Sequence, residues 1–324
     1  MCYSAMENAE LRWLSRHSTN ADVRLDAINE LLRRSTFPND HKVRIRFTKS
    51  LEVAFEKSTD PAHAETAALF ARLRANRRTE LEAGLFQQRT RLVKAERALA
   101  VKETRKALDD RRIATDKVEW HMKQLASLDR KDVRESDRRI FPMWYTLVLA
   151  NVEGRQTVMP MRYHCRQNGK PASIDKQFDG LYNARRDNLD GYWKNLWGRR
   201  HAIMEASAFF ENVALEDFER RALAPGEKSQ NLVLEFKPQA AEPMLFACLW
   251  DCWQSPGEPD LYSFAIITDV PPPEVAATGH DRCPIPLKPE NVDAWLTPED
   301  RTKEELQGIL DDRVRHFYEH RKAA

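Results

Sequence analysis

The chain divides into segments by the spacing of its apolar residues. Residues 7–35 and 59–138 carry apolar side chains three and four positions apart among charged ones, which is the period of a helix with one buried face. From Phe141 onwards the apolar residues come in short runs bounded by glycine, proline or polar clusters, which is typical of buried strands. We therefore predict helices first, a β-rich part afterwards, and a final helix over Pro298–Arg321.

The segment 59–138 has the clearest pattern. It holds a single glycine, Gly84, and no proline beyond its first few residues, so nothing interrupts a helix there. Leu85, Leu92 and Leu99 recur every seven residues, which is the spacing of a coiled-coil seam. We predict one or two long helices that pack as a hairpin. Two interpretations stay open: an arm that binds a protein partner, and an insertion that packs only on itself.

Four short apolar runs follow, and we predict that each is a strand of a mixed or antiparallel sheet. They are Tyr145–Leu149, Leu232–Phe236, Met244–Trp250 and Phe264–Thr268. The fold class is thus α+β, a mixed or antiparallel β core with flanking helices and a long helical insertion. The predicted parts are 1–58 (N-terminal part of the core), 59–138 (coiled-coil-like insertion) and 139–324 (the rest of the core, ending in a helix).

Composition narrows the class of protein. The chain has 324 residues and no run of 18 apolar residues, which excludes a transmembrane helix. Its start shows no secretory signal, and its five cysteines fit free thiols in a reducing compartment, so we expect a cytoplasmic protein. The common glycine-rich nucleotide loops are missing, and cysteine and histidine pairs do not recur at zinc-site spacing. We expect neither a cofactor nor a metal.

Cys2 is the first candidate for chemistry. Removal of Met1 would leave an amine (pKa about 7.7–8.0) and a thiol (pKa about 8.5) on neighbouring carbons of one residue. Such a 1,2-aminothiol condenses with an aldehyde to a Schiff base, and the thiol then closes a five-membered thiazolidine ring. Cysteine at position 2 also occurs in many proteins without any such function, so Cys2 alone decides nothing.

Two further side chains lie where proton transfer is expected. His280 follows a buried strand and a proline-rich loop, a suitable position for a general acid or base. Glu211 ends the apolar stretch 206–211, where partial desolvation would raise the pKa of its carboxyl group. A surface histidine and an edge carboxylate that points to water are the alternatives.

Positive charge concentrates between Arg155 and Arg200, where ten lysines and arginines stand against four aspartates. Six aromatic residues alternate with these charges: Tyr163, Phe178, Tyr182, Tyr192, Trp193 and Trp197. Cations neutralise phosphates and aromatic rings stack on unpaired bases, so this composition fits single-stranded nucleic acid. A solvated basic face over core aromatics is the other interpretation.

Six short segments occur in one order along the chain. They are Met1-Cys2, Asn183-Ala184-Arg185, Phe209-Phe210-Glu211, Leu249-Trp250-Asp251-Cys252-Trp253, Ile266-Ile267-Thr268 and His280-Asp281-Arg282-Cys283-Pro284. Together they resemble the SOS-response-associated peptidase (SRAP) family. The resemblance covers the N-terminus and about 139–296, and it leaves out the helical insertion.

The resemblance implies a sensor that covalently shields abasic sites in single-stranded DNA. In the family, the ring-opened abasic sugar presents an aldehyde that the mature N-terminal cysteine traps as a thiazolidine, and members also release their own Met1. Carried over to this chain, Cys2 is the nucleophile and Asn183 holds its amine or the sugar. Glu211 then shuttles protons, and His280 protonates the sugar hydroxyl as the ring opens. The bound protein would be nucleoid-associated.

The resemblance also implies DNA contacts by Arg185, Arg162, Pro142, Tyr163 and Thr268. The chain departs from the family pattern near some of them. Tyr3-Ser4 replaces Gly-Arg and removes a positive charge beside the nucleophile, and Asn212 replaces a tryptophan. These changes touch predicted DNA contacts and spare the four catalytic positions. Two other functions stay open, a cysteine peptidase acting on other chains and an inactive relative that binds DNA or a protein partner.

Overall fold

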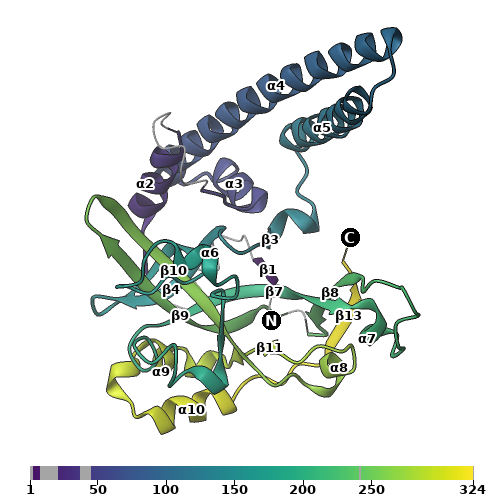
Figure 1. Cartoon of the computed structure of the whole chain (residues 1–324). Coiled ribbons are helices and arrows are strands. Elements are labelled where there is room, and N and C mark those ends of the chain that lie inside the picture. The colour runs from purple at the N-terminus through teal and green to yellow at the C-terminus, as the bar shows by residue number, and fades with distance from the viewer. Residues whose placement is uncertain (1–2, 8–20, 37–44, 241, 324) are drawn as a thin grey trace. The chain divides into compact units, whose positions relative to one another are not determined.

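The computed structural model describes residues 3–7, 21–36, 45–240 and 242–323, which form two compact units. The first unit comprises the described residues up to Ile28, residues 45–57, and those from Arg134 onwards. The second comprises the described residues of 29–44 and residues 58–133. Figure 1 labels their helices and strands. Cys2 and residues 8–20 of the helix predicted over 7–35 lie outside the described residues, and a helix is observed over Leu25–Thr36.

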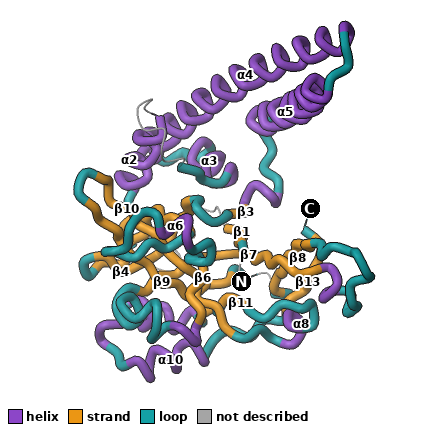
Figure 2. The backbone as a smooth tube through the Cα atoms, viewed as in Figure 1, coloured by secondary structure: helices purple, strands orange, loops and turns teal. Residues whose placement is uncertain are grey.

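The first unit is built on one sheet, whose strands appear orange in Figure 2. Its strands are β1 (Ser4–Glu7), β2 (Asp22–Val23), β3 (Arg139–Ile140), β4 (Tyr145–Val152), β5 (Arg155–Tyr163), β6 (Asn183–Arg185), β7 (His201–Ala214), β8 (Asn231–Pro238), β9 (Met244–Ser255), β10 (Glu258–Asp269), β11 (Cys283–Pro284), β12 (Pro286–Leu287) and β13 (Tyr318–Lys322). All four predicted strands are observed, as β4, β8, β9 and β10. The α+β class is therefore confirmed.

Five of these strands close into a barrel. The order is β9-β10-β5-β4-β7, and β7 pairs with β9 again. Only the contact between β10 and β5 within this ring is parallel. Alternating residues therefore face opposite sides, as in β9, where Phe246 and Cys248 belong to one core cluster and Leu245 and Ala247 to another.

Short helices complete the first unit. They are α3 (Lys49–Glu56), α6 (Ile174–Gln177), α7 (Leu215–Phe218), α8 (Pro273–Ala276), α9 (Val292–Leu296) and α10 (Lys303–Asp311), with 3₁₀ turns between several of them, including η2 (Glu135–Arg138) and η3 (Arg186–Asn188). A capping box begins α10 at Thr302. The Thr302 hydroxyl accepts a hydrogen bond from the Glu305 backbone N–H, and the Glu305 carboxylate accepts one from the Thr302 backbone N–H.

The helix predicted over Pro298–Arg321 is wrong beyond Asp311. The last described residues form β13, which pairs antiparallel with β8. Only Tyr318 of this strand is buried, and the other four side chains are exposed. Arg321 binds the Glu235 carboxylate of β8 at 2.8 Å. A polar edge strand of this kind lacks the apolar alternation by which a strand is recognised in sequence.

The second unit is a helical hairpin, as the sequence predicts. The long helix α4 (Ala64–Val101) and α5 (Arg105–Asp129) run side by side in opposite directions (Figure 1). A seam of buried and half-buried residues, spaced by four and three, follows α4 through Leu81, Leu85, Gln88, Leu92, Ala95 and Leu99. Arg91 on α4 and Asp110 on α5 form an ion pair across the two helices. The end of α2 (Leu25–Thr36) also belongs to this unit.

Within the described ranges, no helix combines the length and the apolar character that crossing a membrane needs.

Candidate active site

A buried carboxylate and an imidazole form the centre of the site. Glu211 lies on β7 and is completely buried, on the same face of the strand as Phe209 and Val213. His280 lies on the segment between α8 and β11, and its Nε2 is 3.2 Å from Oε2 of Glu211. The sheet therefore brings together two residues that are 69 positions apart in sequence.

Burial favours the uncharged form of both groups. It raises the pKa of the Glu211 carboxyl well above its ordinary value, and it lowers the pKa of His280 to about 4. With a pKa of about 4, the His280 imidazole is neutral at pH 7, and the raised pKa of Glu211 favours its protonated form. The Nδ1 of His280 lies 2.9 Å from the carbonyl oxygen and 3.2 Å from the N–H of Arg282, so it has a partner in either tautomer. The pair is thus suited to passing one proton.

Asn183 and Thr268 lie on neighbouring strands. The parallel pairing of β6 with β10 sets Asn183 beside Ile266 and Arg185 beside Thr268. Asn183 is 5% exposed and Thr268 is fully buried, yet the Asn183 amide and the Thr268 hydroxyl have no hydrogen-bond partner among the residues that the structure describes. Buried polar groups normally have partners, so these two are available for a ligand.

The segment from His280 to Pro284 connects these two parts of the site. Pro284 pairs with Thr268 through the contact of β11 with β10. Arg282 donates to Asp187 of η3 at 3.1 Å, and Arg185 donates to the same Oδ2 at 2.7 Å. Half of the Arg185 side chain is exposed. The sequence pattern did not single out Arg282 as part of the site, although a cation two residues after His280 was a visible signal.

The first strand also reaches this site. Cys2 itself is outside the described residues, but Tyr3, which follows it in sequence, donates its N–H to the Phe210 carbonyl at 3.1 Å. Ser4 is directly opposite Phe210 in the pairing of β1 with β7. Glu211 is the next residue along β7, so β1 begins next to the buried carboxyl.

Besides Thr268, two of the predicted DNA contacts lie inside the protein. Arg162 is buried and pairs with the Asp175 carboxylate at 2.8 Å. Tyr163 is fully buried and packs between Tyr182 and Phe264, with ring centroids 5.5 and 5.2 Å away. The sequence showed a basic residue beside an aromatic one, but not the acidic partner that draws the cation inwards.

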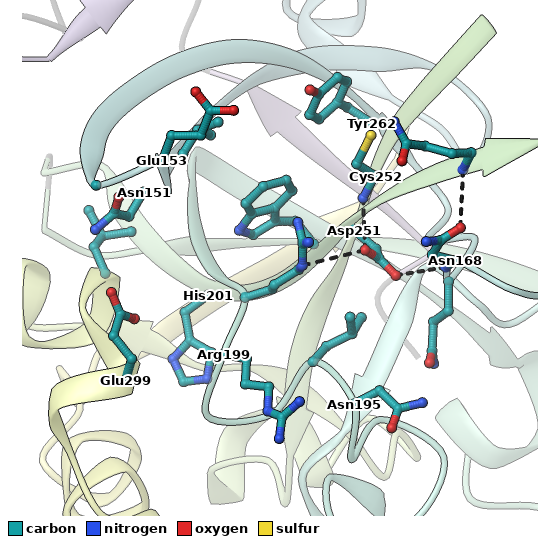
Figure 3. Close-up of a pocket in the computed structure, with 18 residues that line it drawn as sticks. Asn151, Glu153, Asn168, Asn195, Arg199, His201, Asp251, Cys252, Tyr262 and Glu299 are labelled. Carbon is teal, nitrogen blue, oxygen red and sulfur yellow. Dashed lines mark hydrogen bonds and ion pairs between the residues drawn. The ribbon is translucent and has the colours of Figure 1, made fainter.

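A cavity of about 760 Å³ lies elsewhere in the first unit (Figure 3). Tyr262 in its wall precedes Thr268 on β10 by six residues, which is about 20 Å along a strand. His201, also in the wall, accepts the Gly198 N–H at 3.0 Å and donates to the Trp295 carbonyl at 3.2 Å, and burial lowers its pKa to about 3. We interpret His201 as structural.

Over the part of the chain that the structure describes, no group of three or more histidine, cysteine, aspartate or glutamate side chains could hold a metal ion.

Comparison with known proteins decides the family. The sequence profile described as SOS response associated peptidase (SRAP) matches residues 99–321, which is more than half of the chain. The protein belongs to the SRAP family. The resemblance found in the sequence is therefore confirmed.

Within the SRAP family, the chain is similar to two curated proteins of Bacillus subtilis (strain 168). Abasic site processing protein YoqW is 31% identical over 133 residues, which are 40% of this chain and 54% of YoqW. Abasic site processing protein YobE is 30% identical over 133 residues, which are 40% of this chain and 55% of YobE. The match thus spans about half the length of these SRAP relatives.

One solved structure among the matches is a phage-related protein of Bordetella bronchiseptica. It shares 20% sequence identity with this SRAP chain, and the alignment covers 57% of this chain and 81% of that one with a TM-score of 0.43.

Proposed function

We propose that this SRAP protein captures abasic sites in single-stranded DNA covalently. Cys2, once Met1 is removed, is the nucleophile, and the product is a thiazolidine that shields the lesion. Asn183, Glu211 and His280 assist. The similarity to two proteins named for abasic site processing supports the substrate class.

The observation that carries the proposal is the buried pair of Glu211 and His280 beside the first residues of β1. The 3.2 Å contact of the pair and the hydrogen bond from Tyr3 to Phe210 bring proton-transfer groups next to the beginning of β1. An aldehyde trap needs this combination, because its amine attacks only when neutral and its intermediates must exchange protons.

The proposed reaction releases one water. As the sugar ring opens to the aldehyde, the buried pair gives a proton to the ring oxygen and takes up the proton of the anomeric hydroxyl. The Cys2 amine adds to the aldehyde carbon, and loss of water gives an imine. The thiol sulfur then adds to the imine carbon and its proton passes to the nitrogen, which closes the ring. Because both nucleophiles sit on one residue, ring closure is intramolecular.

The remaining polar groups would hold the substrate. The buried Asn183 amide is available for the Cys2 amine or the sugar, and the Thr268 hydroxyl for the same nucleotide. Arg185, whose side chain is half exposed, would bind a phosphate, and Arg282 beside it, 11% exposed, would add positive charge. Pro142 stays a proposed contact, since it is half-buried in a turn. An abasic nucleotide has no base to unstack, so its entry costs little.

The test mixes purified protein with an oligonucleotide that carries one abasic site and separates the products on a denaturing gel. We expect a shifted band that resists heat, requires the lesion and disappears in Cys2→Ala. Cys252→Ala is the matched control, because Cys252 is a free, half-buried thiol on β9. It should crosslink like the wild type.

Other outcomes select the alternatives. An adduct retained in Cys2→Ala would reject the mechanism. Cleavage of added peptides that needs Cys2 would favour a peptidase acting on other chains. DNA binding without any adduct, in protein whose mass shows that Met1 is gone, would favour an inactive binding relative.

A further inference from the structure

Asp187 holds two cations at the edge of the candidate site. Its Oδ1 accepts a hydrogen bond from Nε of Arg185 at 3.1 Å, and its Oδ2 accepts one from Nη2 of the same guanidinium at 2.7 Å. The same Oδ2 also accepts a hydrogen bond from Nη2 of Arg282 at 3.1 Å. One carboxylate therefore binds Arg185 through two parallel bonds and connects it to Arg282.

The two neighbouring arginines of this segment have different partners. Arg185 ends β6, and η3 begins at Arg186. The Arg186 guanidinium binds the carboxylates of Asp269 at 3.0 Å and Asp311 at 2.7 Å, and only 18% of its side chain is exposed. Asp269 is equally buried, so Arg186 is held by the fold. Arg185 is held only by its near neighbour Asp187 and remains at the surface.

The contact of Asp187 with Arg185 is open to solvent. The side chain of Arg185 is 49% exposed and that of Asp187 is 54% exposed. An exposed ion pair contributes little to stability, because water solvates both groups well when they separate. The carboxylate can therefore leave the guanidinium without a large loss of free energy when another anion takes its place.

A DNA phosphate is such an anion. A phosphodiester has two unesterified oxygens, and a guanidinium binds them through two parallel hydrogen bonds, as it binds the two oxygens of a carboxylate. Asp187 occupies the edge of Arg185 that carries Nε and Nη2. A phosphate that binds Arg185 through the same two nitrogens must therefore displace the Asp187 carboxylate.

We propose that Asp187 is a specificity-determining residue, which competes with DNA phosphates for Arg185 and so lowers the affinity of the protein for undamaged strands. The inference rests on the proposed function, in which Arg185 binds a phosphate. The attraction between arginines and phosphates does not depend on a lesion. Because Asp187 weakens this attraction, recognition of the abasic site depends more on Asn183 and on the covalent step.

The charges around this contact support the same role. Asp281 lies 3.8 Å from Nε of Arg282 and is 78% exposed. The two aspartates thus stand against Arg185 and Arg282, and the formal charges of these four side chains cancel. Removal of the Asp187 carboxylate leaves one positive charge in excess beside Arg185, where a phosphate would bind.

The experiment measures binding of an undamaged single-stranded oligonucleotide by fluorescence anisotropy. Undamaged DNA has no aldehyde, so its binding needs neither Cys2 nor an adduct. At about 0.15 M salt we expect Asp187→Asn to bind about three- to tenfold more tightly than the wild type, because Arg185 no longer has a competing carboxylate. Asp187→Glu, which keeps the carboxylate, should bind like the wild type.

Two controls separate the loss of this contact from a general change of charge. Asp190→Asn changes the charge in the same way three residues further along, at a side chain that is 66% exposed and pairs with Lys303. It should change the affinity by less than about twofold, because salt screens distant surface charges. Asp187→Asn should also have hardly any effect in a chain that carries Arg185→Gln, because the cation for which the carboxylate competes is then missing.

A second measurement tests specificity directly. A trace of oligonucleotide with one abasic site is mixed with the protein, and undamaged oligonucleotide is added until the rate of adduct formation falls by half. The concentration needed should be lower for Asp187→Asn than for the wild type, by the same factor as in the binding experiment. Circular dichroism melting of each variant shows that the fold is kept.

Unchanged affinity of Asp187→Asn would overturn the proposal. Weaker binding would also overturn it, because Asp187 would then position Arg185 for the phosphate instead of competing with it. A gain in affinity that persists in the Arg185→Gln background would do the same. Failure of the proposed function is a separate result: a wild type that forms no adduct with abasic DNA, while Asp187→Asn still gains affinity for undamaged DNA, leaves this inference intact.

Discussion

At the scale of single residues, we expect Glu211 and His280 to act as one unit. They share a short contact in a buried place, where the pKa of one is raised and the pKa of the other is about 4. We expect Glu211→Gln and His280→Ala each to slow adduct formation by about 10²- to 10⁴-fold, the usual contribution of acid–base groups. The double variant should be no slower than the slower single variant. Single-turnover rates at saturating DNA measure this, and additive losses would mean separate roles.

Glu7 is another buried carboxyl, and its protonation makes stability depend on pH. Its oxygens accept hydrogen bonds from Thr146 at 2.5 Å, from Ser50 at 3.2 Å and from Thr48, but burial still raises its pKa from 4.5 to about 7. The folded chain therefore holds this proton more tightly than the unfolded chain. Protonation of Glu7 contributes about 3 kcal/mol to the free energy of unfolding. This contribution is fully present below pH 4.5 and is lost as the pH rises to about 7.

Glu7→Gln removes this titration. The difference in unfolding free energy between pH 5 and pH 8, measured by urea denaturation, should become smaller in the variant by about that amount. An unchanged difference would mean that another group is responsible for the pH dependence.

At the scale of elements, Gly84 allows α4 and α5 to approach closely. A Cβ at this position would lie 2.3 Å from Nε2 of His121 on α5. Alanine favours a helix by about 1 kcal/mol over glycine, but here it must displace the His121 ring. We expect Gly84→Ala to stabilise the hairpin by about 1 kcal/mol when His121 is alanine, and by clearly less in the wild type. Hydrogen exchange of α4 amides in a double-mutant cycle measures the difference, and equal effects in both backgrounds would contradict the contact.

Some elements and site residues could be predicted from the sequence, and others could not. The hairpin and four strands were predictable, because heptad spacing and apolar runs are local signals. The pairing of β6 with β10 was not, since a three-residue strand that joins a sheet in parallel leaves no local pattern. His280 and Glu211 were singled out from their positions beside apolar runs, and Asn183 through the family resemblance. The burial of Arg162 could not be predicted, because it depends on Asp175, a partner that only the folded chain brings near.

At the scale of the whole molecule, the proposed site residues belong to the first unit and the hairpin to the second. We therefore expect a variant with residues 85–120 replaced by a short Gly-Ser loop to crosslink abasic DNA at the wild-type rate within about twofold. The design joins positions that already meet at Gly84 and His121. Loss of crosslinking in a folded variant would assign the hairpin a part in DNA binding. That the hairpin binds a protein partner stays a proposal. It would be supported if the full-length chain bound such a partner and the shortened variant did not.

The pairing of β1 with β7 has a consequence for synthesis of the chain. Ser4 is paired with Phe210, so about 200 further residues must be made before β7, one of the two partners of β1, exists. At ribosomal rates this delay lasts about 10–40 s. During that time Met1 and Cys2 have left the ribosome while Glu211 and His280 are still to be made or folded. An aminopeptidase therefore has access to Met1 before the groups that would assist self-cleavage are assembled.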